Sequence, residues 1–251
     1  PMKTNVNFIS YTLRRTVDLT VVIPSVTIPE SLMKVQGEKI SHVIEHKYPV
    51  LYLLHGYGNN HATWTGYSNV ELYAEERQIA VVMLSAENKA YLDCGGDDDY
   101  FDFIENELQE FITNMFPVST KPEDTYIAGL SMGGYGSLCH GLTNPHKYAA
   151  IGSFSGAVNG MNRDLKPLDI LKKDIEEGKK LPPMYIAIGE EDFLFEATLQ
   201  FKAELDKLGV NYTYEQLPNF THEWRFWDMQ VEKYLDWIPR TDHYAGKKRK
   251  V

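Results

Sequence analysis

The sequence GLSMG at residues 129–133, a G-x-S-x-G pattern, constrains this chain more than any other feature. The apolar residues 126–128 precede it directly, and a helix-like segment follows it. A serine between a strand and a helix lies on a sharp turn, and the flanking glycines give that turn room. The turn exposes the hydroxyl and leaves the amide of Met132 facing the place where a substrate oxygen would bind. The pattern also occurs in ordinary turns, but in this context it predicts Ser131 as a nucleophile.

Strand-like and helix-like segments alternate along the chain, which predicts an α/β fold with helices on both faces of a mainly parallel sheet. Several runs are apolar throughout, as buried parallel strands require, and only the first two strands are expected to be antiparallel. The eight predicted strands are residues 8–14, 16–23, 49–54, 80–84, 126–130, 149–154, 184–188 and 211–216. The predicted helices are residues 70–78, 100–115, 131–143, 168–177, 193–208 and 223–237. Residues 155–182 are too few for a large lid, so we expect a small lid or none.

Composition narrows the class of protein. The chain is 43% hydrophobic and 12% aromatic, values typical of a globular domain, and it contains no linker-like segment. We therefore expect one domain over residues 1–251, with an N-terminal extension at 1–7 and a disordered basic tail at 239–251. A net charge of −10 argues against nucleic-acid or anionic-membrane partners. The N-terminal residues lack the apolar segment of a secretion signal, which favours the cytoplasm unless a signal has been removed.

Neither a metal nor another cofactor is expected. Asp97 to Asp99 precede a predicted helix, and Asp99 with Asp102 has the spacing of an N-cap residue and an acid at position N3. No further ligand spacing accompanies these carboxylates, so capping is favoured over a divalent-metal site. Cys94 and Cys139 lie in unlike contexts, which favours two reduced thiols over a disulfide.

A serine hydroxyl needs a base that accepts its proton and an acid that orients the base. Three carboxylates follow the strand 184–188 in the sequence GEED, and the last of them, Asp192, should reach the same edge of the sheet as Ser131. We predict Asp192 as the acid, although all three carboxylates could also serve only as solvated loop residues. His222 lies in the loop after the last strand and is the predicted base.

The loop after the strand 49–54 has the sequence HGYGNN. An H-G-x form at this place is typical of a loop whose backbone amide, here that of Tyr57, faces the amide of Met132 as an oxyanion hole. His55 is then expected to hold the loop in place rather than to act as a base.

These motifs in this order resemble the esterase D family of α/β-hydrolases, and most of all its bacterial tributyrin-esterase-like carboxylesterases. The resemblance extends over about residues 16–237 and also includes the sequence SFSGA at residues 153–157. It implies an α/β-hydrolase fold with Ser131 as nucleophile, Asp192 as acid and His222 as base. The chain departs from the family at Thr221, where relatives usually carry glycine. A β-branched residue avoids positive φ, so we expect a different backbone path before His222.

The reaction that this resemblance implies is hydrolysis of a carboxylic ester through an acyl-enzyme. We expect a small-molecule or oligosaccharide ester as the partner, with a short acyl chain and acetylated sugars as candidates. Feruloyl esterase and S-formylglutathione hydrolase are alternatives, as are an acyltransferase and a non-catalytic binding protein, and a homo-oligomer stays open. The aromatic residues Tyr91, Phe193 and Phe195 are predicted to line the substrate pocket, although aromatics near strand ends more often pack in the core.

Overall fold

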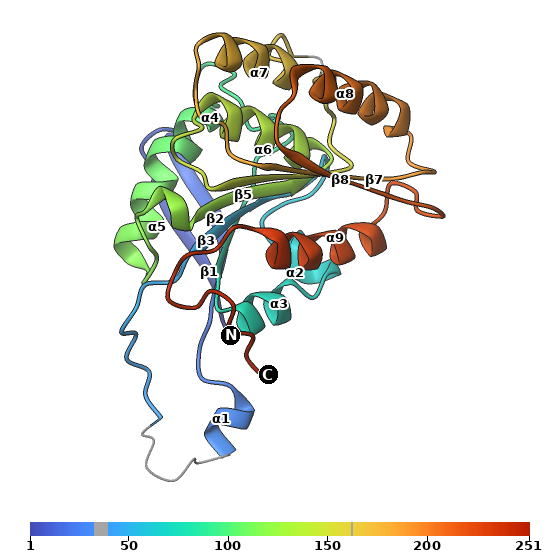
Figure 1. The fold of residues 1–251 in the computed structure, drawn as a ribbon. Helices are drawn as coiled ribbons and strands as arrows, with labels where there is room; N and C mark the ends of the chain where they lie inside the picture. Colours follow the sequence, from blue (N-terminus) through green and yellow to red (C-terminus); the bar gives the residue numbers. More distant parts are fainter. Residues whose placement is uncertain (33–39, 162) are drawn as a thin grey trace.

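An eight-stranded sheet runs through the centre of the protein, with helices on both faces (Figure 1). The computed structural model describes residues 1–32, 40–161 and 163–251. The strand order is β1-β2-β4-β3-β5-β6-β7-β8. The strands are β1 (Met2–Ser10), β2 (Arg15–Ile23), β3 (Val50–Leu54), β4 (Ala80–Leu84), β5 (Thr125–Leu130), β6 (Ala150–Phe154), β7 (Met184–Gly189) and β8 (Tyr212–Leu217). Each of the eight predicted strands overlaps one of these, and the first, predicted at residues 8–14, differs most in its bounds.

The sheet is antiparallel at one edge and parallel elsewhere. Strand β2 pairs antiparallel with both β1 and β4, and all the other neighbours are parallel. Strand β1 begins at Met2 rather than at residue 8, and Met2 pairs with Ile23. Residues 2–7 are therefore part of the sheet and not an extension. Polar and apolar residues alternate there, because an edge strand buries only one face.

The helices also follow the predicted pattern, and two short helices in the N-terminal half, α1 and α2, were not predicted. They are α1 (Ile28–Leu32), α2 (Thr63–Tyr67), α3 (Val70–Arg77), α4 (Tyr100–Asp102), α5 (Gln109–Met115), α6 (Met132–Thr143), α7 (Pro167–Glu176), α8 (Phe195–Leu208) and α9 (Trp224–Trp237). The predicted helix 100–115 contains a π-helical segment, η1 (Phe103–Leu108), between α4 and α5, and a 3₁₀ turn, η2 (Pro122–Asp124), precedes β5. The short helices α1 and α2 lack the apolar periodicity that predicts a longer helix.

The start of α4 differs from the predicted capping arrangement. The Asp99 carboxylate accepts a hydrogen bond from the Gly95 amide at 3.1 Å and so closes the preceding loop. The Asp93 carboxylate accepts from the amide of Asp102 at 3.0 Å instead. Asp99 therefore stands at the predicted N-cap position, but its side chain makes no capping bond, and Asp93 accepts from the first turn instead.

Two apolar cores lie on the two faces of the sheet. One contains side chains of α6, α7 and α8 such as Tyr135, Leu171 and Phe201. The other contains side chains of α2, α3 and α9 such as Trp64 and Phe226. Figure 1 shows α2, α3 and α9 on one side of the sheet and α6, α7 and α8 on the other. This layered arrangement buries β3, β4, β5 and β6 on both faces and leaves their ends free to carry functional loops.

The C-terminal segment 239–251, predicted to be a disordered tail, contacts the rest of the protein. The Arg249 guanidinium pairs with the carboxylates of Glu30 and Glu75 at 2.7 Å each. The Glu75 side chain is fully buried, and Arg249 balances its charge together with the N-terminal amine of Pro1, which lies 2.6 Å from Glu75 Oε2. Within the described ranges, no helix is long and apolar enough to cross a membrane.

Candidate active site

Ser131 lies on the turn between β5 and α6, as the sequence pattern predicts. Its backbone has φ 51° and ψ −114°, a conformation that is costly for a residue with a side chain. Backbone hydrogen bonds hold it there: the Ser131 amide donates to the Phe154 carbonyl at 2.9 Å, and the Ser131 carbonyl accepts from the Tyr135 amide at 3.0 Å. The strand and the helix thus fix the serine in a strained turn.

Close packing explains the second glycine of the pattern. A Cβ atom on Gly133 would overlap the carbonyl oxygen of Leu54, at the end of the neighbouring strand β3. Glycine therefore lets α6 approach β3 closely. The side chains of α6 are buried from Met132 to Leu142, which makes this helix a core element of the fold.

The three residues predicted as nucleophile, base and acid lie together. His222 Nε2 is 3.0 Å from Ser131 Oγ, and His222 Nδ1 is 2.8 Å from Asp192 Oδ2. The carboxylate can only accept, so Nδ1 donates to it and Nε2 is free to accept the serine proton. The second Asp192 oxygen accepts from the Leu194 amide at 2.9 Å. Asp192 is buried and its carboxylate is fully paired, while His222 is partly exposed.

The loops that carry the acid and the base pack tightly against each other. Asp192 follows β7, and His222 follows β8, the strand next to β7. The Glu191 amide donates to the Phe220 carbonyl at 3.0 Å, and a Cβ atom on Gly189 would overlap that same carbonyl oxygen. The close approach of the two loops brings the carboxylate within reach of the imidazole.

Thr221, the departure from the family pattern, occupies an ordinary conformation. The left-handed position of this loop is Asn219, with φ 64°, and asparagine tolerates that region well. Thr221 has a negative φ and donates its amide to Glu223 Oε1 at 3.3 Å. The loop therefore reaches the site without a glycine before His222.

The loop HGYGNN passes beside the serine. A Cβ atom on Gly56 would lie 3.5 Å from Ser131 Cβ, so the loop passes directly beside the nucleophile at the residue before Tyr57. The Gly58 amide donates to the Asn88 side chain at 2.6 Å, which fixes the loop from the far side. The amide of Met132 is the first of α6 and has no partner within the helix. Both predicted oxyanion donors thus lie near Ser131.

His55 supports this loop, as predicted. It is buried, its Nδ1 donates to the Gly56 carbonyl at 2.7 Å, and its Nε2 accepts from the Ala86 amide at 3.0 Å. This pairing requires the neutral imidazole, and burial lowers the pKa of His55 to about 4. The side chain is a structural bridge between two loops and has no free nitrogen for catalysis.

The aromatic residues predicted to line the pocket have three different environments. Tyr91 does not line it: the side chain is fully buried, and its hydroxyl donates to the His55 carbonyl at 2.8 Å. Its ring packs beneath Gly136, so Tyr91 is a core residue and the prediction was wrong. Phe193 is 76% exposed, and its ring lies 4.6 Å from the ring of His222. Phe195 is half-buried at the start of α8, where its amide donates to the Asp192 carbonyl at 2.9 Å.

One residue beside the imidazole was not identified from the sequence. The ring of Trp227 lies 4.9 Å from that of His222 and nearly perpendicular to it. Trp227 is on the first turns of α9, on the buried face of that helix. Its position five residues after the predicted base was the available signal, but an aromatic residue in an amphipathic helix is normally core.

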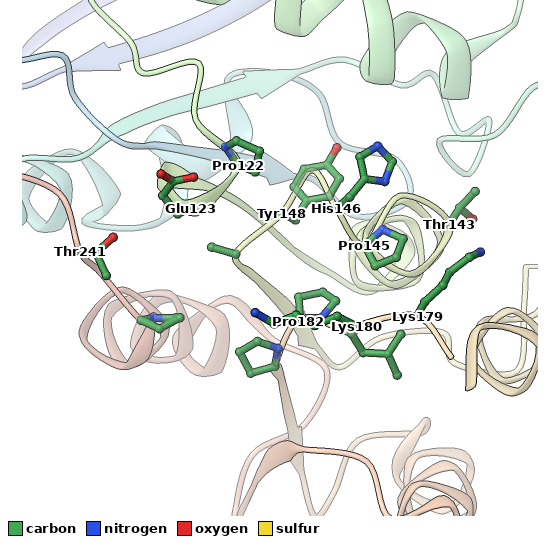
Figure 2. Close-up of a pocket in the computed structure, with 14 residues that line it drawn as sticks. Pro122, Glu123, Thr143, Pro145, His146, Tyr148, Lys179, Lys180, Pro182 and Thr241 are labelled. Atoms are coloured by element: carbon green, nitrogen blue, oxygen red, sulfur yellow. The ribbon is translucent and has the colours of Figure 1, made fainter. Parts of the chain in front are cut away.

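A cavity of about 840 Å³ lies at the end of the parallel strands that is opposite to Ser131 (Figure 2). It is formed where the chain enters β5, β6 and β7, and the proline rings of Pro122, Pro145 and Pro182 contribute to its walls. None of the predicted site residues lines it. Within the part of the chain that the structure describes, no group of three or more His, Cys, Asp or Glu side chains is arranged to hold a metal ion.

Comparison with known proteins now identifies the family. Residues 40–237 match the family described as "Putative esterase", which is more than half of the chain. The protein belongs to this esterase family. The esterase is 29% identical to an acetyl esterase of Caldicellulosiruptor saccharolyticus, over 94% of this chain and 97% of that protein.

Solved structures agree with this assignment. The esterase resembles a fluorophosphonate-binding serine hydrolase of Staphylococcus aureus in its substrate-bound form, with a TM-score of 0.83 and 27% identity over 96% of this chain and 99% of the other. It also resembles an S-formylglutathione hydrolase of the same organism, with a TM-score of 0.80 and 27% identity over 94% of this chain and 98% of the other. The fold is therefore that of the α/β-hydrolases, as the sequence motifs imply.

Proposed function

We propose that this esterase is a serine carboxylesterase that hydrolyses short-chain acyl esters, with acetyl groups on carbohydrates among its substrates. The observation that carries the proposal is the continuous hydrogen-bonded series from Asp192 through His222 to Ser131, with the serine on a strained turn. The acetyl esterase relative supports a small acyl group. Between β6 and β7 the chain adds one helix, α7, which is consistent with a small lid and an open site.

The proposed reaction is acyl transfer to water. His222 Nε2 accepts the proton of Ser131 as the serine oxygen attacks the ester carbonyl carbon, and the amides of Tyr57 and Met132 donate to the oxyanion that forms. The intermediate collapses, the alcohol leaves with the proton from His222, and an acyl-serine remains. Water then attacks the carbonyl carbon of the acyl-serine while His222 accepts a proton from the water. The acid is released as His222 returns that proton to Ser131 Oγ. Asp192 stays ionised throughout and holds the imidazole in the tautomer with Nδ1 protonated.

Ser131→Ala tests the nucleophile. We expect the variant to lose p-nitrophenyl acetate turnover on the order of 10⁶-fold while its unfolding transition stays cooperative. A fluorophosphonate probe should label the natural protein at Ser131 and leave the variant unlabelled. Retained turnover or labelling in the variant would place the nucleophile elsewhere.

The acyl preference is tested with a series of p-nitrophenyl esters from acetate to decanoate. We expect kcat/KM to be highest for acetate and to fall as the chain lengthens, since a site without a large lid offers little apolar surface to a long chain. Acetylated xylan and methyl ferulate extend the series to sugar and aromatic esters. A maximum at the decanoate would contradict the short-chain assignment.

Hydrolysis of S-formylglutathione is a second candidate, because a hydrolase of that thioester is 27% identical to this chain over 94% of its length. Formyl is the smallest acyl group, so the same site could accept it. Comparison of kcat/KM for S-formylglutathione and p-nitrophenyl acetate distinguishes the two. A thousandfold preference for the thioester would favour this candidate.

We further propose that residues 1–251 act as one domain in the cytoplasm on a small-molecule or oligosaccharide ester. The two free cysteines, Cys94 and Cys139, support a reducing compartment. The net charge of −10 supports a role without nucleic acid. Cell fractionation with an antibody against the protein tests the compartment.

A further inference from the structure

The two hydrogen bonds of His222 leave one rotation of its ring unfixed. The bonds to Asp192 and Ser131 engage the two ring nitrogens and so hold the imidazole along one line. Tilting of the ring about that line changes neither bond length to first order. The proton on Nε2 must later reach a leaving group beside Ser131, so this tilt matters for catalysis. The bond from the ring to Cβ limits the tilt only as far as the side-chain torsions are fixed, so packing against the ring contributes as well.

Trp227 provides a contact that is anchored to the sheet. Its indole is 5% exposed and lies perpendicular to the imidazole, with the ring centres 4.9 Å apart. The indole Nε1 donates to Ser155 Oγ at 3.1 Å. Ser155 is fully buried directly after β6, and its amide donates to the Ala187 carbonyl of β7 at 2.8 Å. Through Ser155, the tryptophan is therefore tied to the end of β6 and to β7.

Phe193, the residue directly after Asp192, provides a second contact with the imidazole. Its ring centre lies 4.6 Å from that of His222, with the two ring planes tilted by 49°. The side chain is 76% exposed, so it contributes little to the core. Its recorded ring contact is with the imidazole of His222, so the effect expected of this side chain is on the base and not on the core.

We infer that Trp227 and Phe193 form an aromatic bracket that sets the tilt of the His222 ring, with Ser155 as the anchor of Trp227. These are positioning residues, because they touch the base and not the reacting atoms. The inference rests on the proposed function, since it assigns a role only if His222 transfers the proton. Edge-to-face and tilted ring pairs of this kind favour a defined relative geometry, and a small misplacement of a base lowers the rate strongly.

The test compares Trp227→Phe and Trp227→Ala with Trp237→Phe. Trp237 is a matched control, because it lies on the same helix and its Nε1 donates to Thr213 Oγ1 at 2.9 Å, outside the site. We expect Trp227→Ala to lower kcat for p-nitrophenyl acetate on the order of 100-fold with KM changed less than threefold. Trp227→Phe restores a ring without the anchor and should recover most of this loss. Trp237→Phe should leave kcat within twofold.

Phe193→Ala and Phe193→Leu test the exposed half of the bracket. We expect a loss in kcat of about tenfold for the alanine variant and a smaller loss for leucine, which restores bulk without the aromatic ring. Ile9→Ala is the matched control, because Ile9 is 78% exposed on β1 and should have no effect on kcat. A stability change is not expected for either exposed position.

A readout without turnover separates the inference from the proposed function. The Nδ1 proton of His222, hydrogen-bonded to Asp192, gives a low-field proton resonance in NMR spectra. We expect this proton to exchange with water at least tenfold faster in Trp227→Ala than in the natural protein or in Trp237→Phe. The inference would be overturned if the Trp227 variants and Trp237→Phe had the same exchange rate of the Nδ1 proton and the same kcat. A natural protein that does not hydrolyse esters would overturn the proposed function, while the exchange rates would still decide the positioning.

Discussion

Acidification is expected to destabilise the esterase through His55. The folded protein holds this imidazole in its neutral form, because Nε2 accepts from the Ala86 amide and burial lowers the pKa from 6.5 to about 4. In the unfolded chain the same imidazole takes up a proton near pH 6.5. Between these two values the unfolded state binds more protons than the folded state, so the free energy of unfolding falls as the pH falls.

The size of the effect follows from the two pKa values. A difference from 6.5 to about 4 corresponds to ~3 kcal/mol, which is fully present above pH 6.5 and fully lost below pH 4. Carboxylates of the protein titrate in the lower part of the same range, so the natural protein alone does not isolate this contribution. His55→Gln does, since its amide oxygen can accept from the Ala86 amide and carries no titrating proton.

The assay is urea unfolding of the natural protein and of His55→Gln at intervals from pH 7.5 to pH 4. We expect the free energy of unfolding of the natural protein to fall by ~3 kcal/mol relative to that of His55→Gln as the pH falls, with most of the change between pH 6.5 and pH 4.5. Parallel curves over the whole range would refute the argument, because they would mean that His55 has the same proton affinity in both states.

Three further substitutions have definite expected outcomes. Ser131→Gly removes the side chain from a left-handed position, and urea unfolding should show it to be ~1 kcal/mol more stable than Ser131→Ala. Gly133→Ala forces a Cβ atom onto the Leu54 carbonyl oxygen and should lower the thermal midpoint strongly, whereas Gly66→Ala, where the added atom meets nothing within 4 Å, should not. Asp192→Asn should preserve the fold by circular dichroism and lower kcat on the order of 10⁴-fold, since an amide can stabilise the wrong tautomer of the base. A kcat within tenfold of the natural value would remove Asp192 from the proposed mechanism.

Sequence patterns predicted the fold well where burial was complete. Strands β3 to β7 are buried along their whole length, and the glycine and serine pattern after β5 stands between such a strand and a helix. Strand β1 was placed too late, because an edge strand with one solvated face alternates polar and apolar residues. The π-helical segment within 100–115 has no signal in the periodicity, since it preserves the amphipathic pattern of the helix around it.

Side-chain environments were harder to predict than elements. The prediction of Asp192 and His222 used the fact that each follows a strand. Because β7 and β8 are parallel neighbours, the loops after them lie at the same end of the sheet. Tyr91 and Phe193 have the same local signal, an aromatic residue after a strand, yet one is core and the other is on the surface. Only tertiary packing distinguishes them. Trp227 illustrates the same limit, because a residue of a helix core face can also touch a functional side chain.

The burial of helix α6 has a consequence for how this enzyme could acquire new substrates. Its side chains are buried from Met132 to Leu142, and Gly133 sits against the backbone of β3, so almost any substitution there disturbs the packing of the sheet. The loops around the serine, by contrast, carry exposed side chains such as that of Tyr57, of which only the backbone amide has a proposed role in the reaction. A directed-evolution library for altered ester preference should therefore vary these loops and leave the helix untouched. Such a library should keep Asp192, His222 and the aromatic residues that contact His222, because these loops also carry the proposed catalytic groups.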